Sequence, residues 1–126
     1  MLPTNYHQAY KSLLRKLEDF SLALLDGDAS TGLQSFQALQ TCLEGEILSL
    51  NDDNFSPEVA NRWRTVQTEL YRSWRLLETD WLFLASARQG REKRLQIISE
   101  RVATLKGYCR VLLGSVVDYS NSKFRM

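Results

Sequence analysis

The sequence is poor in the residues that usually carry catalytic or cross-linking chemistry. Its 126 residues include two cysteines, two prolines and one histidine. Cys42 and Cys109 lie far apart and have no CxxC partner, so we expect two reduced, buried thiols and no disulfide. His7 belongs to no recognisable catalytic motif, and the sequence therefore gives no indication of histidine-based catalysis.

Long apolar segments are also lacking. No apolar run approaches the roughly 20 residues that span a bilayer, and the first residues lack the apolar core of a signal peptide. We therefore expect a cytoplasmic protein with no membrane insertion. The hydrophobic fraction of 44% and the charged fraction of 25% are typical of one ordinary globular domain, here residues 1–126.

Short motifs of common catalytic and cofactor sites are absent as well. The sequence contains no GxSxG, no phosphate-binding glycine loop and no HExxH. Closely spaced acidic pairs such as Glu44 and Glu46 are two residues apart, so on a helix they point in different directions. We expect neither an enzyme nor a protein that holds a cofactor or a metal ion.

Apolar residues do recur at helical spacing, in four segments. Gly27 and Gly90 suit the ends of the first and third segments, whereas Gly32 and Gly45 weaken the second. Short connections favour antiparallel neighbours, which predicts an all-α, elongated, up-down-up-down four-helix bundle with a long third helix. The predicted helices cover residues 4–26, 30–50, 57–89 and 92–118, and the tail 119–126 is expected to fray.

The third predicted helix has two apolar stripes. Trp63, Trp74 and Trp81 fall on one side of it, which predicts a face buried in the bundle core. Leu76 and Phe83 point about 120 to 140° away from that face, with Asp80 along the edge of their stripe. This second stripe contacts another helix of the bundle or forms a surface for a dimer or a partner.

Charge is unevenly distributed along the chain. Residues 1–63 have 4 Lys/Arg and 9 Asp/Glu, a net of −5, whereas residues 64–126 have 12 and 6, a net of +6. The sum is the formal net charge of +1. A basic cluster at Arg88, Arg91, Lys93 and Arg94 is either a solvated end of the bundle or a surface that recognises carboxylates or phosphates. Nucleic acid is the less favoured partner, because the near-neutral chain lacks a strongly basic footprint.

One part of the sequence resembles a known family. The resemblance lies in residues 75–89, RLLETDWLFLASARQ, and in the later residues Arg94, Leu95, Ile98, Arg101, Leu105, Tyr108 and Cys109. This region, roughly a third of the chain, resembles the cyanobacterial PatD family of small heterocyst-frequency control proteins. Its most specific elements are the pattern LLExDxxFLxxARQ and the later YC pair.

The resemblance implies a non-enzymatic regulator that binds the tubulin-like division protein FtsZ and promotes its assembly or bundling. Arginine and aromatic side chains commonly dominate interfaces, so we expect partner contacts from within and beside this segment. A homodimer is a further possibility, since bundling requires two sites or two copies. A helical adaptor or chaperone for another cytosolic protein, or a ligand-binding bundle, stays open as an alternative. The candidate contact residues are Leu76, Asp80, Phe83, Arg88, Arg91 and Arg94.

Overall fold

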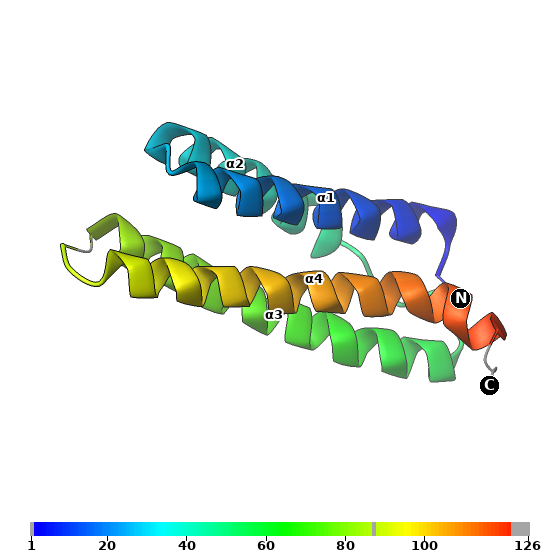
Figure 1. Ribbon diagram of the computed structural model, residues 1–126. Helices are drawn as coiled ribbons and strands as arrows, with labels where there is room; N and C mark the ends of the chain where they lie inside the picture. The colour runs from blue at the N-terminus through cyan, green and yellow to red at the C-terminus, as the bar shows by residue number, and fades with distance from the viewer. Residues whose placement is uncertain (1, 87, 122–126) are drawn as a thin grey trace.

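The computed structural model of the chain describes residues 2–86 and 88–121. They form α1 (Thr4–Asp26), α2 (Ala29–Cys42), a short π-helix η1 (Leu43–Ile47), α3 (Pro57–Ser86) and α4 (Arg91–Asn121). The hairpins α1–α2 and α3–α4 lie along each other and give an elongated antiparallel bundle (Figure 1). The prediction of an all-α, up-down-up-down four-helix bundle with a long third helix is confirmed.

The second helix differs from the prediction of one continuous helix over 30–50. The α-helix ends at Cys42 and continues as one π-helical turn that contains Gly45, a weak helix former. The Leu48 N–H donates to the Leu43 carbonyl at 2.9 Å, and the Gln67 side-chain amide donates to the Ile47 carbonyl at 2.9 Å. A side chain of α3 thus stabilises the end of this turn, in which Leu43 and Ile47 are both fully buried.

The other helix ends follow the glycine signals closely. Gly27 and Gly90 have φ values of 78° and 71°, the left-handed conformation that glycine adopts without strain after a helix. At the start of α3, the Ser56 hydroxyl accepts a hydrogen bond from the Val59 N–H at 3.4 Å. Helix α3 ends at Ser86, before the predicted 89, and α4 includes residues 119–121 of the tail expected to fray. The rest of that tail, residues 122–126, lies outside the described residues.

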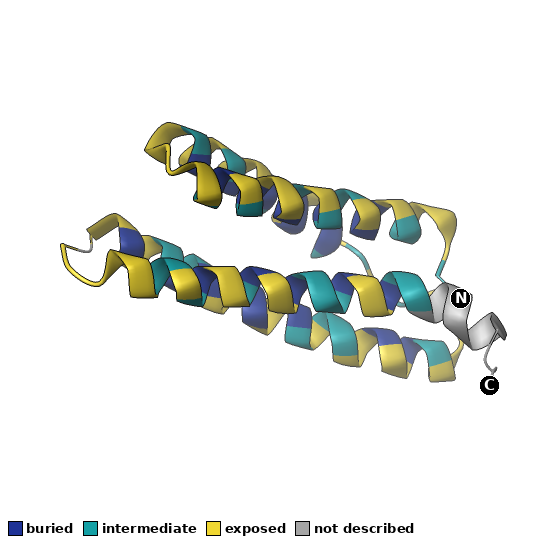
Figure 2. Cartoon of the chain, viewed as in Figure 1, coloured by how far each residue is buried: buried dark blue, intermediate teal, exposed yellow. Residues whose placement is uncertain are grey.

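The core runs along the bundle between the two hairpins, where the inner helix faces are buried (Figure 2). Each α-helix contributes apolar side chains at 3- and 4-residue spacing. Leu33 of α2 lies at this spacing but is exposed. The core members with 0% exposure are Tyr10, Leu13, Leu17, Phe20, Leu39, Leu43, Ile47, Leu70, Leu77, Ile98, Leu105 and Cys109.

Aromatic rings fill the space between α2 and α3. Among the described residues, no Cα of α2 lies within 8 Å of a Cα of α3. Phe36 of α2 stacks on Trp74 and Trp81 of α3, with ring centroids 5.5 and 4.9 Å apart. Trp74 is buried as predicted, whereas Trp81 is partly buried and packs against the core. The large rings therefore hold the hairpins together across a wide helix spacing.

The third tryptophan anchors the opposite end of the bundle. Buried Trp63 donates its indole N–H to the Tyr10 hydroxyl at 2.8 Å, and that hydroxyl donates to the Gln67 side-chain oxygen at 2.7 Å. Burial raises the pKa of Tyr10 well above its usual value. These bonds connect α1 to α3, and Gln67 extends the connection to η1.

Candidate partner-binding surface

The turn between α3 and α4 places the candidate residues on one hairpin. Gly90 turns the chain, and Arg91 donates from Nη1 to the Leu84 carbonyl at 2.9 Å. Leu84 is near the end of α3, where backbone carbonyls lack partners within the helix. Arg91 therefore caps α3, and α4 returns antiparallel beside it.

Asp80 is the buried centre of the predicted residue set. It is only 7% exposed and lies between two arginines of α4. Its Oδ1 accepts a hydrogen bond from Arg94 Nη1 at 3.3 Å, and its Oδ2 accepts one from Arg101 Nε at 3.0 Å. The prediction that Asp80 contacts a partner directly does not fit this burial, because both carboxylate oxygens are already engaged. Asp80 instead positions the two arginines and joins α3 to α4.

Leu76 and Phe83 lie on the surface beside this ion-pair cluster. Leu76 is 42% exposed and Phe83 is 52% exposed, so the second stripe of α3 is not part of the bundle core. The Arg94 guanidinium carbon lies 5.2 Å from the centroid of the Phe83 ring, which gives a cation–π contact. Leu76, Phe83, Arg94 and Arg101 thus form one apolar and cationic surface, which we call the hairpin face.

Of the remaining predicted residues, Arg88 lies in the turn and Arg91 is the first residue of α4, and both are exposed. Arg88 has no ion pair with any described residue, whereas Arg91 is engaged in capping α3. The structure adds Arg101, which was absent from the predicted set. Its spacing of seven residues from Arg94 places both on one side of α4, and this was the available signal.

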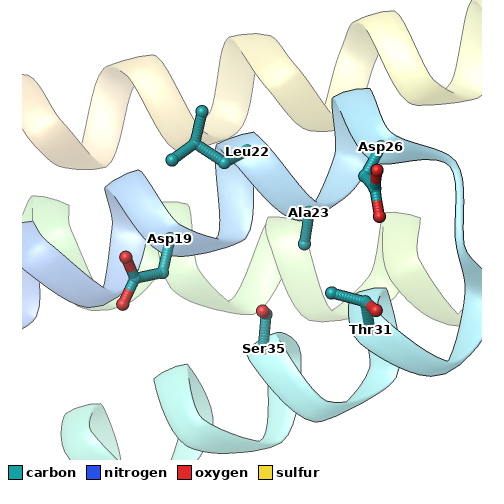
Figure 3. A pocket seen from close by; sticks show the side chains of 6 residues that line it. All are labelled: Asp19, Leu22, Ala23, Asp26, Thr31 and Ser35. Carbon is teal, nitrogen blue, oxygen red and sulfur yellow. The ribbon is translucent and has the colours of Figure 1, made fainter.

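A hollow of about 400 Å³ lies on the other hairpin, between α1 and α2 (Figure 3). Two exposed carboxylates of α1, Asp19 and Asp26, border it together with hydroxyl groups of α2, while Leu22 points to the other side of α1. In the described part of the chain, no group of three or more His, Cys, Asp or Glu residues could hold a metal ion. The lining residues are Asp19, Leu22, Ala23, Asp26, Thr31 and Ser35.

Both cysteines are free and buried. Burial raises the pKa of the Cys42 thiol and raises that of Cys109 to about 12. Both thiols are therefore protonated near neutral pH, and since the thiolate is the nucleophile, neither one is activated for catalysis.

Comparisons with known proteins give no match for the chain: no protein-family model, no curated protein and no solved structure matches it. Across residues 2–86 and 88–121, no helix is sufficiently long and apolar to cross a bilayer. Any functional assignment therefore depends on the surface itself and on the sequence pattern of residues 75–109.

Proposed function

We propose that the protein is a non-enzymatic regulator of cell division that binds FtsZ through the hairpin face. Binding promotes FtsZ assembly or bundling and thereby tunes heterocyst frequency. The observation that carries the proposal is an exposed aromatic ring beside arginines that a buried carboxylate holds in place. Such a surface suits a partner segment with both apolar and acidic side chains.

The arrangement favours binding because it is ordered before the partner arrives. Arg94 is held by Asp80 on one side and by the Phe83 ring on the other. A restrained arginine loses less conformational freedom on binding than one that is free in solvent. Aromatic and arginine side chains also contribute a large share of the energy in many interfaces. The hairpin face therefore has both the residue types and the rigidity of a recognition site.

The identity of the partner is supported by the resemblance to the PatD family. Every residue of the hairpin face lies within the region that carries this resemblance, residues 75–109. Because FtsZ acts in the cytoplasm, the proposal places the protein there too. An acidic segment of FtsZ would complement the net charge of +6 over residues 64–126.

Sedimentation of FtsZ with GTP, with and without the protein, tests this function. We expect the wild-type protein to increase the pelleted FtsZ and to produce bundles visible by electron microscopy. Phe83→Ser should weaken binding roughly tenfold or more, as expected for the loss of an interface anchor. Leu33→Ser is the matched control, because Leu33 is 47% exposed on α2 and lies outside the hairpin face.

Circular dichroism of both variants separates loss of binding from loss of fold. If the wild-type protein changes neither the pelleted amount nor the filament morphology, FtsZ is not the partner. If Phe83→Ser and Leu33→Ser weaken binding equally, the hairpin face is not the binding site. Chemical cross-linking could also capture a protein other than FtsZ. If capture of that protein requires Phe83, the result would instead favour an adaptor for another cytosolic protein.

A further inference from the structure

The most exposed leucines gather at one end of the bundle. Among the large apolar side chains that the structure describes, Leu25, Leu82 and Leu22 have the highest exposures, 84%, 68% and 65%. Each lies within the last five residues of α1 or α3. The α1–α2 and α3–α4 turns both lie at this end of the bundle, on the left in Figure 1. Three leucines thus meet solvent at the end of the bundle that lies away from the termini.

The same end has two regions of opposite charge. Residues 18–28, which we call the acidic tip, contain Glu18, Asp19, Asp26 and Asp28 and no Lys or Arg, a net of −4. Residues 84–93, which we call the basic tip, contain Arg88, Arg91, Lys93 and one acidic residue, Glu92, a net of +2. Exposed leucines lie at both regions, because Leu22 and Leu25 belong to the acidic tip and Leu82 lies two residues before the basic tip.

Among the described residues, no ion pair joins the acidic tip to the basic tip within one molecule. Asp19, Asp26 and Arg88 are exposed, and none of them forms an ion pair with another described residue. Asp26 is also the last residue of α1, where a negative charge is unfavourable beside the negative end of the helix dipole. A carboxylate at this position is unfavourable for the isolated molecule and becomes favourable once a cation approaches from outside.

We propose that a second copy of this chain covers the bundle end, with the acidic tip of each copy against the basic tip of the other. A two-fold axis meets this requirement, since in such an interface residue i contacts residue j and residue j contacts residue i. One end that carries both charges is complementary to itself. Leu22, Leu25 and Leu82 supply the apolar part of the contact, and the unpaired charges set its orientation.

Self-association at this end is distinct from the hairpin face. Leu82 and Phe83 are neighbours in sequence but point about 100° apart around α3. Leu76 lies roughly 15 Å along the helix from the end of α3. A dimer joined at the bundle end therefore presents two hairpin faces, and it could bridge two filaments if the proposed FtsZ binding is correct. The self-association itself does not depend on FtsZ.

Sedimentation velocity of the full chain over a concentration series tests the proposal without any partner. We expect a reversible monomer–dimer equilibrium between 14.6 kDa and twice that mass. Asp26→Arg and Arg88→Glu should each raise the dimer dissociation constant roughly tenfold or more, because like charges then face each other across the interface. Mixing the two variants should restore the dimer, since both contacts of the mixed pair again join opposite charges.

Two charge reversals elsewhere serve as matched controls. Asp53→Arg and Arg110→Glu change exposed residues distant from the tips and should leave the dissociation constant unchanged. Leu25→Ser should weaken the dimer without altering the circular dichroism spectrum, because Leu25 is largely exposed. A wild-type protein that is monomeric at every concentration overturns the proposal, because a second copy then does not cover the exposed leucines. A mixture that stays monomeric, or an assembly larger than a dimer, overturns the reciprocal two-fold contact.

Discussion

Removal of the Asp80 carboxylate should destabilise the bundle by about 2 kcal/mol. Hydrogen bonds to charged groups each contribute about 1.5–3 kcal/mol, and Asp80 accepts two, from Arg94 and Arg101. Breaking a fully buried ion pair costs about 3–5 kcal/mol. The side chains of Arg94 and Arg101 are 35% and 37% exposed, so water solvates part of each guanidinium after the change. The expected loss for Asp80→Ala therefore lies below that for a fully buried pair.

Urea denaturation followed by circular dichroism measures this loss. The matched control is Asp52→Ala, because Asp52 pairs with Arg64, whose side chain is 62% exposed. Exposed pairs contribute about 0–1 kcal/mol, so the control should shift the midpoint much less. A double-mutant cycle with Arg101→Ala should give a coupling of about 1 kcal/mol or more. If Asp80→Ala lowers the free energy of unfolding no more than Asp52→Ala does, the ion pairs of Asp80 do not hold α3 to α4.

Further predictions concern the core. Tyr10→Phe should lower the free energy of unfolding by about 1–3 kcal/mol, because the buried indole N–H of Trp63 loses its acceptor. An unchanged midpoint in chemical denaturation would contradict this. Gly32→Ala should raise the free energy of unfolding by about 0.5–1 kcal/mol, since its added Cβ would lie 3.5 Å from Trp81 in ordinary contact; a loss of stability would show that the site is tighter than this. Stability should also fall in alkali. Burial raises the pKa of the Cys109 thiol from its ordinary value of 9.0 to about 12, so the contribution of this thiol to stability is complete below pH 9 and decreases as the pH rises toward 12. Cys109→Ala should make this decrease shallower by about 1.4 kcal/mol per pH unit, and equal slopes would refute it.

The helical architecture could be predicted because its signals are local. Apolar spacing of 3 and 4 residues identifies four helices, and Gly27 and Gly90 mark two of their ends. The π-helical turn could not be predicted in this way. One of the hydrogen bonds at its end comes from Gln67, which is 20 residues away in sequence on another helix. A tertiary contact thus supports the end of this turn, and a local apolar pattern carries no information about such a contact.

The candidate surface shows the same division between local and tertiary signals. The angular position of Leu76 and Phe83 on α3 follows from sequence alone, and it separates them from the tryptophan face. Whether another helix covers that position depends on where α4 packs. A helical wheel of α3 carries no information about the position of α4. The burial of Asp80 likewise depends on the register that brings Arg94 and Arg101 of α4 beside it. The candidate residues could thus be selected from the sequence. Which of them are buried, like Asp80, and which are exposed, like Leu76 and Phe83, could not be predicted from it.

The packing of the two hairpins also explains why the charge asymmetry of the chain persists on its surface. Contacts between the hairpins are largely apolar and aromatic, supplemented by neutral hydrogen bonds such as that from Tyr10 to Gln67. The ion pairs of Asp80, by contrast, lie within the α3–α4 hairpin and compensate only part of its excess of arginine. Uncompensated surface charge acts over roughly 8 Å at physiological ionic strength and is screened further by added salt. Self-association at the bundle end and partner binding at the hairpin face should therefore both weaken as salt concentration rises, whereas the aromatic contacts between the hairpins should not.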